Sequence, residues 1–460
     1  MNKFNRIHAM KTCTMDMTRV PLFKNIFIYS LPLIFSNLLQ VLFNIADVAV
    51  VGHFAGAMPL GSVGSTSQLL FFYTGILMGL GGGINVIVAF YIGSKDKIKL
   101  DESLKASFAI NLAIGILLMI TGLLSAKPVL TLIKTKPELL EGAVTYFKIY
   151  MLGIPGCALY NFGSASLSAA GDTRRPMIYL SVAGITNLAL NLLFVIVFKM
   201  DCAGVAAASV ISEYISAFLV LKTLMKGIGD VKLNLKNFRL ADLNRQITIR
   251  ILKIGIPSGL QNAIFAVANT FVQVGINSFD AVMVAGTAVS SNLDPIVYNT
   301  MAAFYTACAS FIGQNYGARN KKRIRQSYLI CLFYSFSFGL GLGLLLWVTG
   351  RQSLGIFTSD PEVIDAGLLR LNIMSFSYCI ASFMDNTIAA NRGLGKTFVP
   401  SIIVMLGSCI FRIIWVNTIF AFFKTIPSLF LLYAFSWFIT AIAEAVYFVR
   451  IYRKISIKNQ

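Results

Sequence analysis

The sequence contains one long internal repeat. The stretch from Pro32 to Pro176 recurs from Pro257 to Pro400, about 224 residues later, and the offset changes only once, from 225 to 224, near Ser67 and Ser291. Matched positions include Asn37 with Asn262, Asn44 with Asn269, Gly93 with Gly317 and Thr173 with Thr397. Internal duplication is a recurring build of membrane transport proteins, whose sites lie where the two repeats meet. The repeat therefore predicts a chain of two similar membrane units.

Composition supports a membrane protein independently of the repeat. Hydrophobic residues make up 57% of the 460 residues, charged residues only 13%, and the mean hydropathy is +0.74. In soluble proteins about a quarter of the residues are charged. We therefore expect most of the chain to lie in lipid.

Twelve apolar stretches are long enough to cross the ~30 Å hydrocarbon core as helices. They lie at 25–51, 63–92, 104–125, 143–168, 176–198, 203–225, 251–276, 281–313, 326–349, 366–390, 398–421 and 427–450. Each copy of the repeat contributes six, so both copies enter the membrane in the same orientation. This predicts an all-α integral membrane protein of twelve helices in two six-helix lobes.

The loops predict how the lobes are joined and oriented. Lys and Arg gather in loops on one side of the spans, which places both termini in the cytoplasm. The net charge of +20 then fits contact with anionic membrane lipids, and we expect no nucleic acid partner. We expect a cytoplasmic segment at 1–24, an N-terminal lobe at 25–225, a cytoplasmic linker at 226–250, a C-terminal lobe at 251–451 and a cytoplasmic tail at 452–460.

The residue types do not suggest an enzyme. The two histidines, His8 and His53, are far apart, and the seven cysteines show no metal-ligand spacing. Gly395-Lys396-Thr397 resembles the end of a phosphate-binding loop, but the glycine required five residues earlier is Ala390. We therefore expect no cofactor and no metal other than a coupling ion, and energy from an ion gradient.

Charged residues inside spans are costly, by about 2.5–3.5 kcal/mol on insertion scales, so each is a functional candidate. Asp47 lies fifteen residues after Pro32 and is a candidate proton or cation switch, or else a helix-bonding group. Gln40 precedes it by two helical turns, and Asn187 and Asn191 lie one turn apart in the fifth span.

The other charged residues have structural and functional interpretations. Glu213 and Glu444 occupy comparable places in the sixth span of each half, as helix-bonding groups or a proton relay, and Asp385 could reach the membrane interface. Arg412 lies ~18 Å along its helix from Pro400. Asp294 is expected at similar depth, so the two predict an interhelical ion pair, with an anionic-substrate or coupling contact as the alternative.

Several short segments resemble one known family. They are Leu31-Pro32 through Asp47, Gly171-Asp172-Thr173-Arg174 with Pro176, Gly313-Gln314-Asn315-Tyr316-Gly317-Ala318, and Asn391-Arg392-Gly393-Leu394-Gly395. These segments, their order and the twelve predicted spans resemble the multidrug and toxin extrusion (MATE) transporters. The resemblance covers nearly the whole chain. The resemblance implies two lobes arranged in a V that export amphipathic, commonly cationic compounds in exchange for H+ or Na+.

The resemblance also assigns roles to residues. It implies a cation-coupling site at Asp47, Gln40, Asn187, Asn191 and Ser209, and a helix hinge at Pro32. Ser209 stands where the family usually has threonine, and Asn191 replaces an acid, which removes a charge from the ion site. The glutamate of NorM-like members is missing from span seven, so the chain looks closer to the DinF-like bacterial branch.

The sequence thus predicts a secondary active multidrug efflux transporter of small amphipathic organic cations, coupled to H+ and/or Na+ through Asp47. We expect a monomer in the bacterial inner membrane. Candidates for the substrate cavity or a proton relay are Glu213, Asn44, Gln261, Gln273, Asp294, Asp385 and Arg412. The alternative is a flippase of a lipid-linked oligosaccharide, which would need a strongly cationic cavity for a pyrophosphate group.

Overall fold

The computed structural model describes residues 15–236, 238–239 and 243–455. These residues form helices joined by short connections, and they contain no β-strand; one isolated bridge pairs Ile228 with Val231. Parts of the expected segments at 1–24, 226–250 and 452–460 lie outside the described residues.

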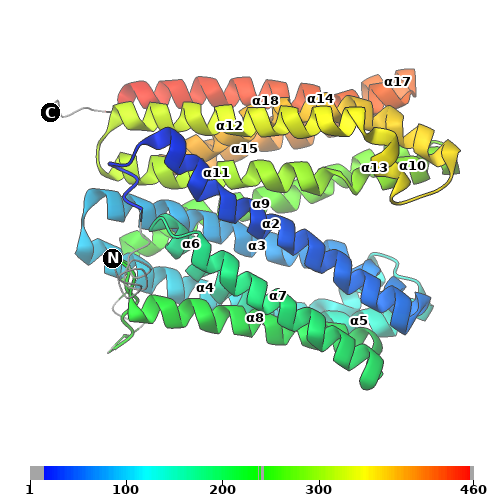
Figure 1. Cartoon of the computed structure of the whole chain (residues 1–460), viewed down its shortest axis with the longest axis horizontal. Helices are drawn as coiled ribbons and strands as arrows, with labels where there is room; N and C mark the ends of the chain where they lie inside the picture. Colours follow the sequence, from blue (N-terminus) through cyan, green and yellow to red (C-terminus); the bar gives the residue numbers. More distant parts are fainter. Residues whose placement is uncertain (1–14, 237, 240–242, 456–460) are drawn as a thin grey trace, which may run out of the picture. The chain divides into compact units, whose positions relative to one another are not determined.

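The helices of the first half follow one another closely along the chain (Figure 1). They are α2 (Leu22–Val50), the π-helical turn η1 (Val51–Ala55), α3 (Ala57–Ser94), α4 (Lys97–Leu132), α5 (Pro137–Met151), α6 (Ile154–Ala169), α7 (Arg174–Leu192), the π-helical turn η2 (Leu193–Val197) and α8 (Asp201–Lys226).

The second half repeats this series with more interruptions. It consists of α9 (Arg245–Ile276), α10 (Ala281–Ser291), α11 (Asp294–Gly317), α12 (Lys321–Val348), α13 (Gly350–Gly355), α14 (Pro361–Gly393), α15 (Phe398–Val404), η4 (Met405–Ile410), α16 (Phe411–Trp415), η5 (Val416–Phe420), α17 (Ala421–Phe423) and α18 (Ile426–Lys454). The segments from α15 to α17 form one continuous span with two π-helical stretches.

The expectation of twelve membrane helices is confirmed by the lengths and hydropathies of these elements. Among the described residues, eleven helices are long and apolar enough to cross a membrane. A twelfth span is the pair α5 and α6, which is bent by 44° at the break between Met151 and Ile154. Leu152 and Gly153 at this break precede Pro155, which cannot donate to the preceding turn.

The chain divides into two compact units, and the division falls inside two helices. The N-terminal unit takes in Phe35–Gly259, and the C-terminal unit takes in Pro21–Ile34 together with the chain from Leu260 onward. The sequence halves 25–225 and 251–451 differ from these units at the starts of two helices. The first part of α2 belongs to the C-terminal unit, and the first part of α9 belongs to the N-terminal unit. Each boundary lies two residues after a proline, Pro32 in α2 and Pro257 in α9.

Side-chain contacts explain why the first turns of α2 belong to the C-terminal unit. The Tyr29 hydroxyl lies 2.9 Å from Ser310 Oγ, and its ring meets Phe311 edge-on at 5.5 Å between centroids. Phe23 packs on Tyr334 at 4.9 Å between centroids. Aromatic contacts of this kind stabilise by more than their buried area alone.

In the N-terminal unit, the first turns of α9 cross α3 at very short range. A Cβ on Gly79 would collide with the backbone of Gly259, and one on Gly83 would lie 2.9 Å from the backbone nitrogen of Gly255. Because only glycine lets two helix backbones approach this closely, these residues serve packing. Gly79 and Gly83 are therefore explained by helix packing.

Each unit is organised around one central helix. In the N-terminal unit α6 packs against α3, α4 and α8. In the C-terminal unit α14 packs against α10, α11, α12 and α18 (Figure 1).

Candidate functional site

An acidic site in the N-terminal unit joins three helices through Asp47. The Asn191 amide donates from Nδ2 to Asp47 Oδ1 over 2.5 Å and to Asn187 Oδ1 over 3.0 Å. Asn187 in turn donates to Ser209 Oγ over 3.3 Å. The chain of hydrogen bonds therefore runs from α2 through α7 to α8.

Local sequence explains how these groups meet. Asn187 and Asn191 are four residues apart, so they lie on one face of α7, and both are buried. Helices α7 and α8 pack side by side, which brings Ser209 to the same face. The structure thus unites four of the five expected site residues. Gln40 is exposed and makes no hydrogen bond to a described residue.

Within the part of the chain that the structure describes, the acidic site contains no Lys or Arg partner for Asp47. No ion pair within the described residues involves Asp47, and Asn191 Oδ1 is buried without a hydrogen-bond donor. A partly buried carboxylate and a spare amide oxygen form a set of acceptors. Such a set can take up a proton or a hard cation that prefers oxygen ligands.

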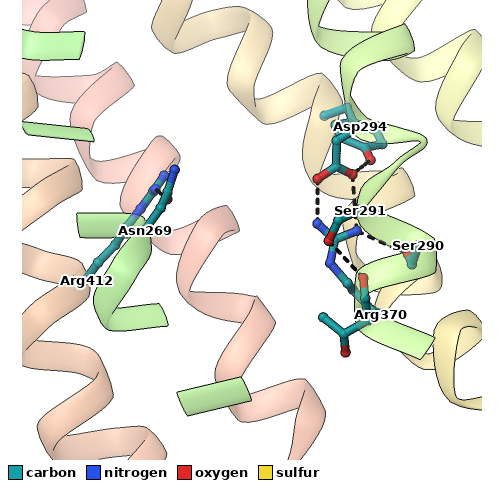
Figure 2. A network of polar contacts seen from close by, with 8 residues as sticks. Asn269, Ser290, Ser291, Asp294, Arg370 and Arg412 are labelled. Atoms are coloured by element: carbon teal, nitrogen blue, oxygen red, sulfur yellow. Dashed lines mark hydrogen bonds and ion pairs between the residues drawn. The ribbon is translucent and has the colours of Figure 1, made fainter. Parts of the chain in front are cut away.

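The C-terminal unit contains a buried ion pair between Asp294 and Arg370. Arg370 donates from Nη2 to Asp294 Oδ2 over 2.5 Å and from Nη1 to Ser290 Oγ over 3.1 Å. The Tyr378 hydroxyl donates to Asp294 Oδ1 over 2.6 Å. Figure 2 shows Arg370, Ser290 and Asp294 converging from different helices. Arg370 therefore neutralises the charge of Asp294 within the C-terminal unit.

The expected ion pair between Asp294 and Arg412 is wrong. Arg412 instead donates from Nη1 to Asn269 Oδ1 over 2.8 Å, on a different part of the unit (Figure 2). Its guanidinium lies over the Tyr433 ring at 4.4 Å and over Phe265 at 5.5 Å. The depth of a residue along its helix does not fix the direction in which the side chain points, and Arg370 occupies the place beside Asp294.

Arg370 is the functional candidate that the sequence interpretation missed. It lies inside the expected span at 366–390, nine residues after the start of α14 at Pro361, and its side chain is 5% exposed. An arginine at that depth is itself a sign of a buried acidic partner. The signal was therefore present in the sequence.

Glu213 and Glu444 do not form an equivalent pair. The residue 224 positions after Glu213 is Trp437, so the two glutamates occupy different turns of the repeat. Glu444 is fully buried and accepts a 2.7 Å hydrogen bond from Asn391 Nδ2, which leaves its Oε1 without a donor. Glu213 has no side-chain hydrogen bond to a described residue. Only Glu444 therefore bonds two helices.

Another polar cluster surrounds Arg392 in the C-terminal unit. Arg392 donates to Gln261 Oε1 over 2.8 Å and also to the Tyr305 hydroxyl. Asp385 is half-buried and forms no ion pair with Arg392 within the described residues. Gln261 is thus a structural partner of an arginine rather than an open cavity group in this structure.

The remaining candidates lie outside these clusters. Gln273 is exposed and donates to Asn277 Oδ1 over 2.9 Å on its own helix. Asn44 is exposed and has no hydrogen bond to a described residue. Among the residues that the structure describes, no group of three or more His, Cys, Asp or Glu side chains could hold a metal ion.

Comparison with known proteins identifies the family. The MatE family model matches residues 32–193 and again 257–419, so each match begins at one of the two prolines of the repeat. The Bacillus subtilis protein named probable multidrug resistance protein YpnP is 30% identical over 79% of this chain and 80% of its own. The Thermotoga maritima protein named probable multidrug resistance protein NorM is 27% identical over 82% of this chain and 81% of its own length.

A solved structure shows the same fold. It is an outward-facing multidrug resistance MATE family transporter with a TM-score of 0.89 and 21% identity, which covers 97% of this chain and 99% of its own. The duplicated sequence, the twelve spans and the double family match agree. The chain therefore belongs to the MatE family of membrane transporters.

Proposed function

We propose that this protein exports amphipathic organic cations in exchange for H+ or Na+, with Asp47 as the coupling carboxylate. The observation that carries the proposal is the hydrogen-bonded set of Asp47, Asn191, Asn187 and Ser209 inside a membrane-length helix bundle. A carboxylate without a protein counter-ion is stabilised in such a bundle by a proton or a bound cation.

The coupling follows from competition for one carboxylate. An ion or proton on Asp47 removes the negative charge that attracts an organic cation, so the two bind in turn. Pro32 lies in the same helix, close to the point where α2 passes from one compact unit to the other. Occupancy of Asp47 would then bias the shape of α2 at Pro32.

The oxygen set supports a proton more directly than Na+. Asn191 supplies one spare acceptor, Asn187 Oδ1 already accepts from Asn191, and Ser209 Oγ donates to the Val205 carbonyl over 3.0 Å. With a single carboxylate, the site offers few free ligands for a hard cation. We therefore propose H+ as the main coupling ion and Na+ as a weaker one.

The relatives support export of drugs, since YpnP and NorM are named as multidrug resistance proteins. We further propose a bacterial inner-membrane location with both termini in the cytoplasm, on the distribution of Lys and Arg. A flippase is less well supported, because Arg370 and Arg392 are engaged by protein partners, which leaves Arg412 as a single cation where a pyrophosphate group would need several.

Proteoliposome efflux tests the proposal. The purified protein is reconstituted, and efflux of rhodamine 6G, a fluorescent lipophilic cation, is followed under a pH gradient and then under a Na+ gradient. Wild type, Asp47→Asn and Glu138→Gln are compared; Glu138 is an exposed acidic residue of the same unit.

We expect pH-driven efflux in wild type and in Glu138→Gln, and its loss in Asp47→Asn. No efflux from wild type under either gradient would exclude cation antiport. Equal efflux from Asp47→Asn and wild type would exclude Asp47 as the coupling group.

A further inference from the structure

Arg412 is a buried cation whose charge is not neutralised by the protein. Its side chain lies in α16 and is 2% exposed. Within the described residues it forms no ion pair, and its Nε has no hydrogen-bond acceptor. The acidic residue expected to neutralise it, Asp294, is held by Arg370. Arg412 therefore retains unused capacity to bind an anion.

The present contacts of Arg412 compensate its charge only in part. Asn269 offers a neutral amide oxygen at 2.8 Å, and the faces of Tyr433 and Phe265 offer cation–π contacts. The bond to Asn269 has one ionised partner, whereas a bond to a carboxylate, sulfonate or phosphate would have two and would add the attraction between opposite charges. A carboxylate, sulfonate or phosphate would therefore bind this guanidinium better than Asn269 does.

The guanidinium lies behind a side chain that can move. Asn269 is exposed, although the group to which it bonds is almost wholly buried, and Tyr433 and Phe265 are half-buried beside it. Rotation of the Asn269 side chain would uncover Nη1 without displacing a packed helix. The rings of Tyr433 and Phe265 would then lie beside an incoming anionic group.

The repeat shows that Arg412 has no charged counterpart in the N-terminal unit, where Leu188 occupies the matching position. In the register that pairs Pro176 with Pro400, the counterparts of Asn187 and Asn191 are Phe411 and Trp415. In the register that pairs Asn44 with Asn269, the counterpart of Asp47 is Val272. The C-terminal unit thus lacks the carboxylate and both amides of the acidic site, and Arg412 follows directly after Phe411.

We propose that Arg412 is the anion-binding group of a second ligand site, within the C-terminal unit, for amphipathic organic anions. The ligand's carboxylate or sulfonate would replace Asn269 as acceptor for the guanidinium, and its apolar body would lie against Tyr433 and Phe265. Arginine suits this task because its planar fork presents two parallel N–H groups to such an anion. The site goes beyond the cation export proposed above.

Direct binding tests the site without relying on transport. The protein is placed in phosphatidylcholine nanodiscs and titrated calorimetrically with naphthalene-1-sulfonate, with empty nanodiscs as the blank. The cation 1-naphthylmethylammonium has the same ring system and opposite charge. Variants are Arg412→Gln, Arg412→Lys and Asn269→Ala, and the control is Arg351→Gln, an exposed arginine of the same unit.

We expect wild type and Arg351→Gln to bind the sulfonate equally. Arg412→Gln should weaken sulfonate binding by about tenfold or more while cation binding is unchanged, since one charge-assisted contact is lost. Arg412→Lys should weaken it by a smaller factor, because the charge stays and the fork is lost. Asn269→Ala should strengthen it severalfold by removing the competing acceptor.

Several results would overturn the site. The first is that wild type does not bind the sulfonate. The second is that wild type and Arg412→Gln bind the sulfonate equally. The third is that the cation binds more tightly than the sulfonate and that this cation binding depends on Arg412. If Arg412→Gln does not fold, unchanged binding in both Arg412→Lys and Asn269→Ala has the same meaning. Loss of binding in phosphatidylglycerol nanodiscs would assign the site to a lipid headgroup instead. Efflux of rhodamine 6G is scored separately, so failure of cation export leaves this result interpretable.

Discussion

Asn191 donates its side-chain amide to Asp47 across 2.5 Å, although the two residues are 144 positions apart. The bond fixes the last part of α2 against α7 and places an amide where a second carboxylate would face Asp47. One side chain therefore decides how many negative charges the acidic site carries. This choice affects which ion the site prefers.

Asn191→Asp should make transport more dependent on Na+. A second carboxylate beside Asp47 gives a hard cation two charged oxygen ligands in place of one. We expect rhodamine 6G efflux driven by a Na+ gradient to rise by about threefold or more, measured in proteoliposomes at constant pH. Asn417→Asp, which adds a carboxylate at an exposed position of the C-terminal unit, is the control. An unchanged Na+ dependence in Asn191→Asp would argue against ion binding here.

The pair of Asp294 and Arg370 should stabilise the C-terminal unit strongly. Removal of one partner leaves an uncompensated buried charge, which costs about 3–5 kcal/mol. Asp294→Asn or Arg370→Met should therefore each lower the melting temperature in detergent by about 10 °C. The double variant should recover much of this loss, because no charge remains unpaired.

A matched surface pair provides the control for this prediction. Arg351 and Asp365 form an ion pair whose side chains are 61% and 58% exposed. Exposed pairs are worth about 1 kcal/mol or less, so Arg351→Met should change the melting temperature by only about 3 °C. If Arg370→Met were as mild as Arg351→Met, the buried pair would have no special weight.

Part of the acidic site could be predicted from local spacing, whereas its assembly from Asp47, the two asparagines and Ser209 was expected from the family resemblance. Asn187 and Asn191 share a helix face by their spacing alone, and Asp47 lies at a fixed distance from Pro32. The twelve spans follow likewise from runs of apolar residues. The hydropathy of a segment depends only on its own residues, so each span can be predicted without knowing the rest of the fold.

The ion pair in the C-terminal unit could not be assigned correctly from depth alone. Asp294, Arg370 and Arg412 all lie within spans, and the choice between the two arginines depends on how each helix is rotated about its axis. The exchange of helix ends at Pro32 and Pro257 was hidden for a similar reason. Apolar residues before and after each proline do not specify the bundle on which they pack.

The close crossing of α3 and α9 should tolerate no added side chain at Gly79. A Cβ there meets the backbone of Gly259, so Gly79→Ala forces the helices apart. We expect a loss of about 1–3 kcal/mol and a melting temperature lower by about 5 °C. Gly82 lies three residues further along α3, and nothing would lie within 4 Å of its added Cβ.

Gly82→Ala is therefore the matched control. Alanine is the better helix former, so this variant should melt at the same temperature as wild type or slightly higher. Equal melting of Gly79→Ala and Gly82→Ala would show that the backbones do not approach as closely as the structure has them. Thermal unfolding followed by tryptophan fluorescence distinguishes the two results.

Pro32 should be required for rapid transport rather than for folding. It removes one backbone donor from the interior of α2, so the carbonyl of Ile28 lacks its helical partner close to the boundary between the two units. Pro32→Ala restores that hydrogen bond and stiffens the helix. We expect a melting temperature a few degrees higher, with rhodamine 6G efflux slowed by about threefold or more.

Pro137 provides the control. It stands at the first position of α5, where no hydrogen bond is lost, so Pro137→Ala should leave the melting temperature and the efflux rate unchanged. Wild-type efflux from Pro32→Ala would mean that α2 does not need to bend at this residue, and the same measurement on Pro257→Ala would then show whether α9 provides the hinge alone.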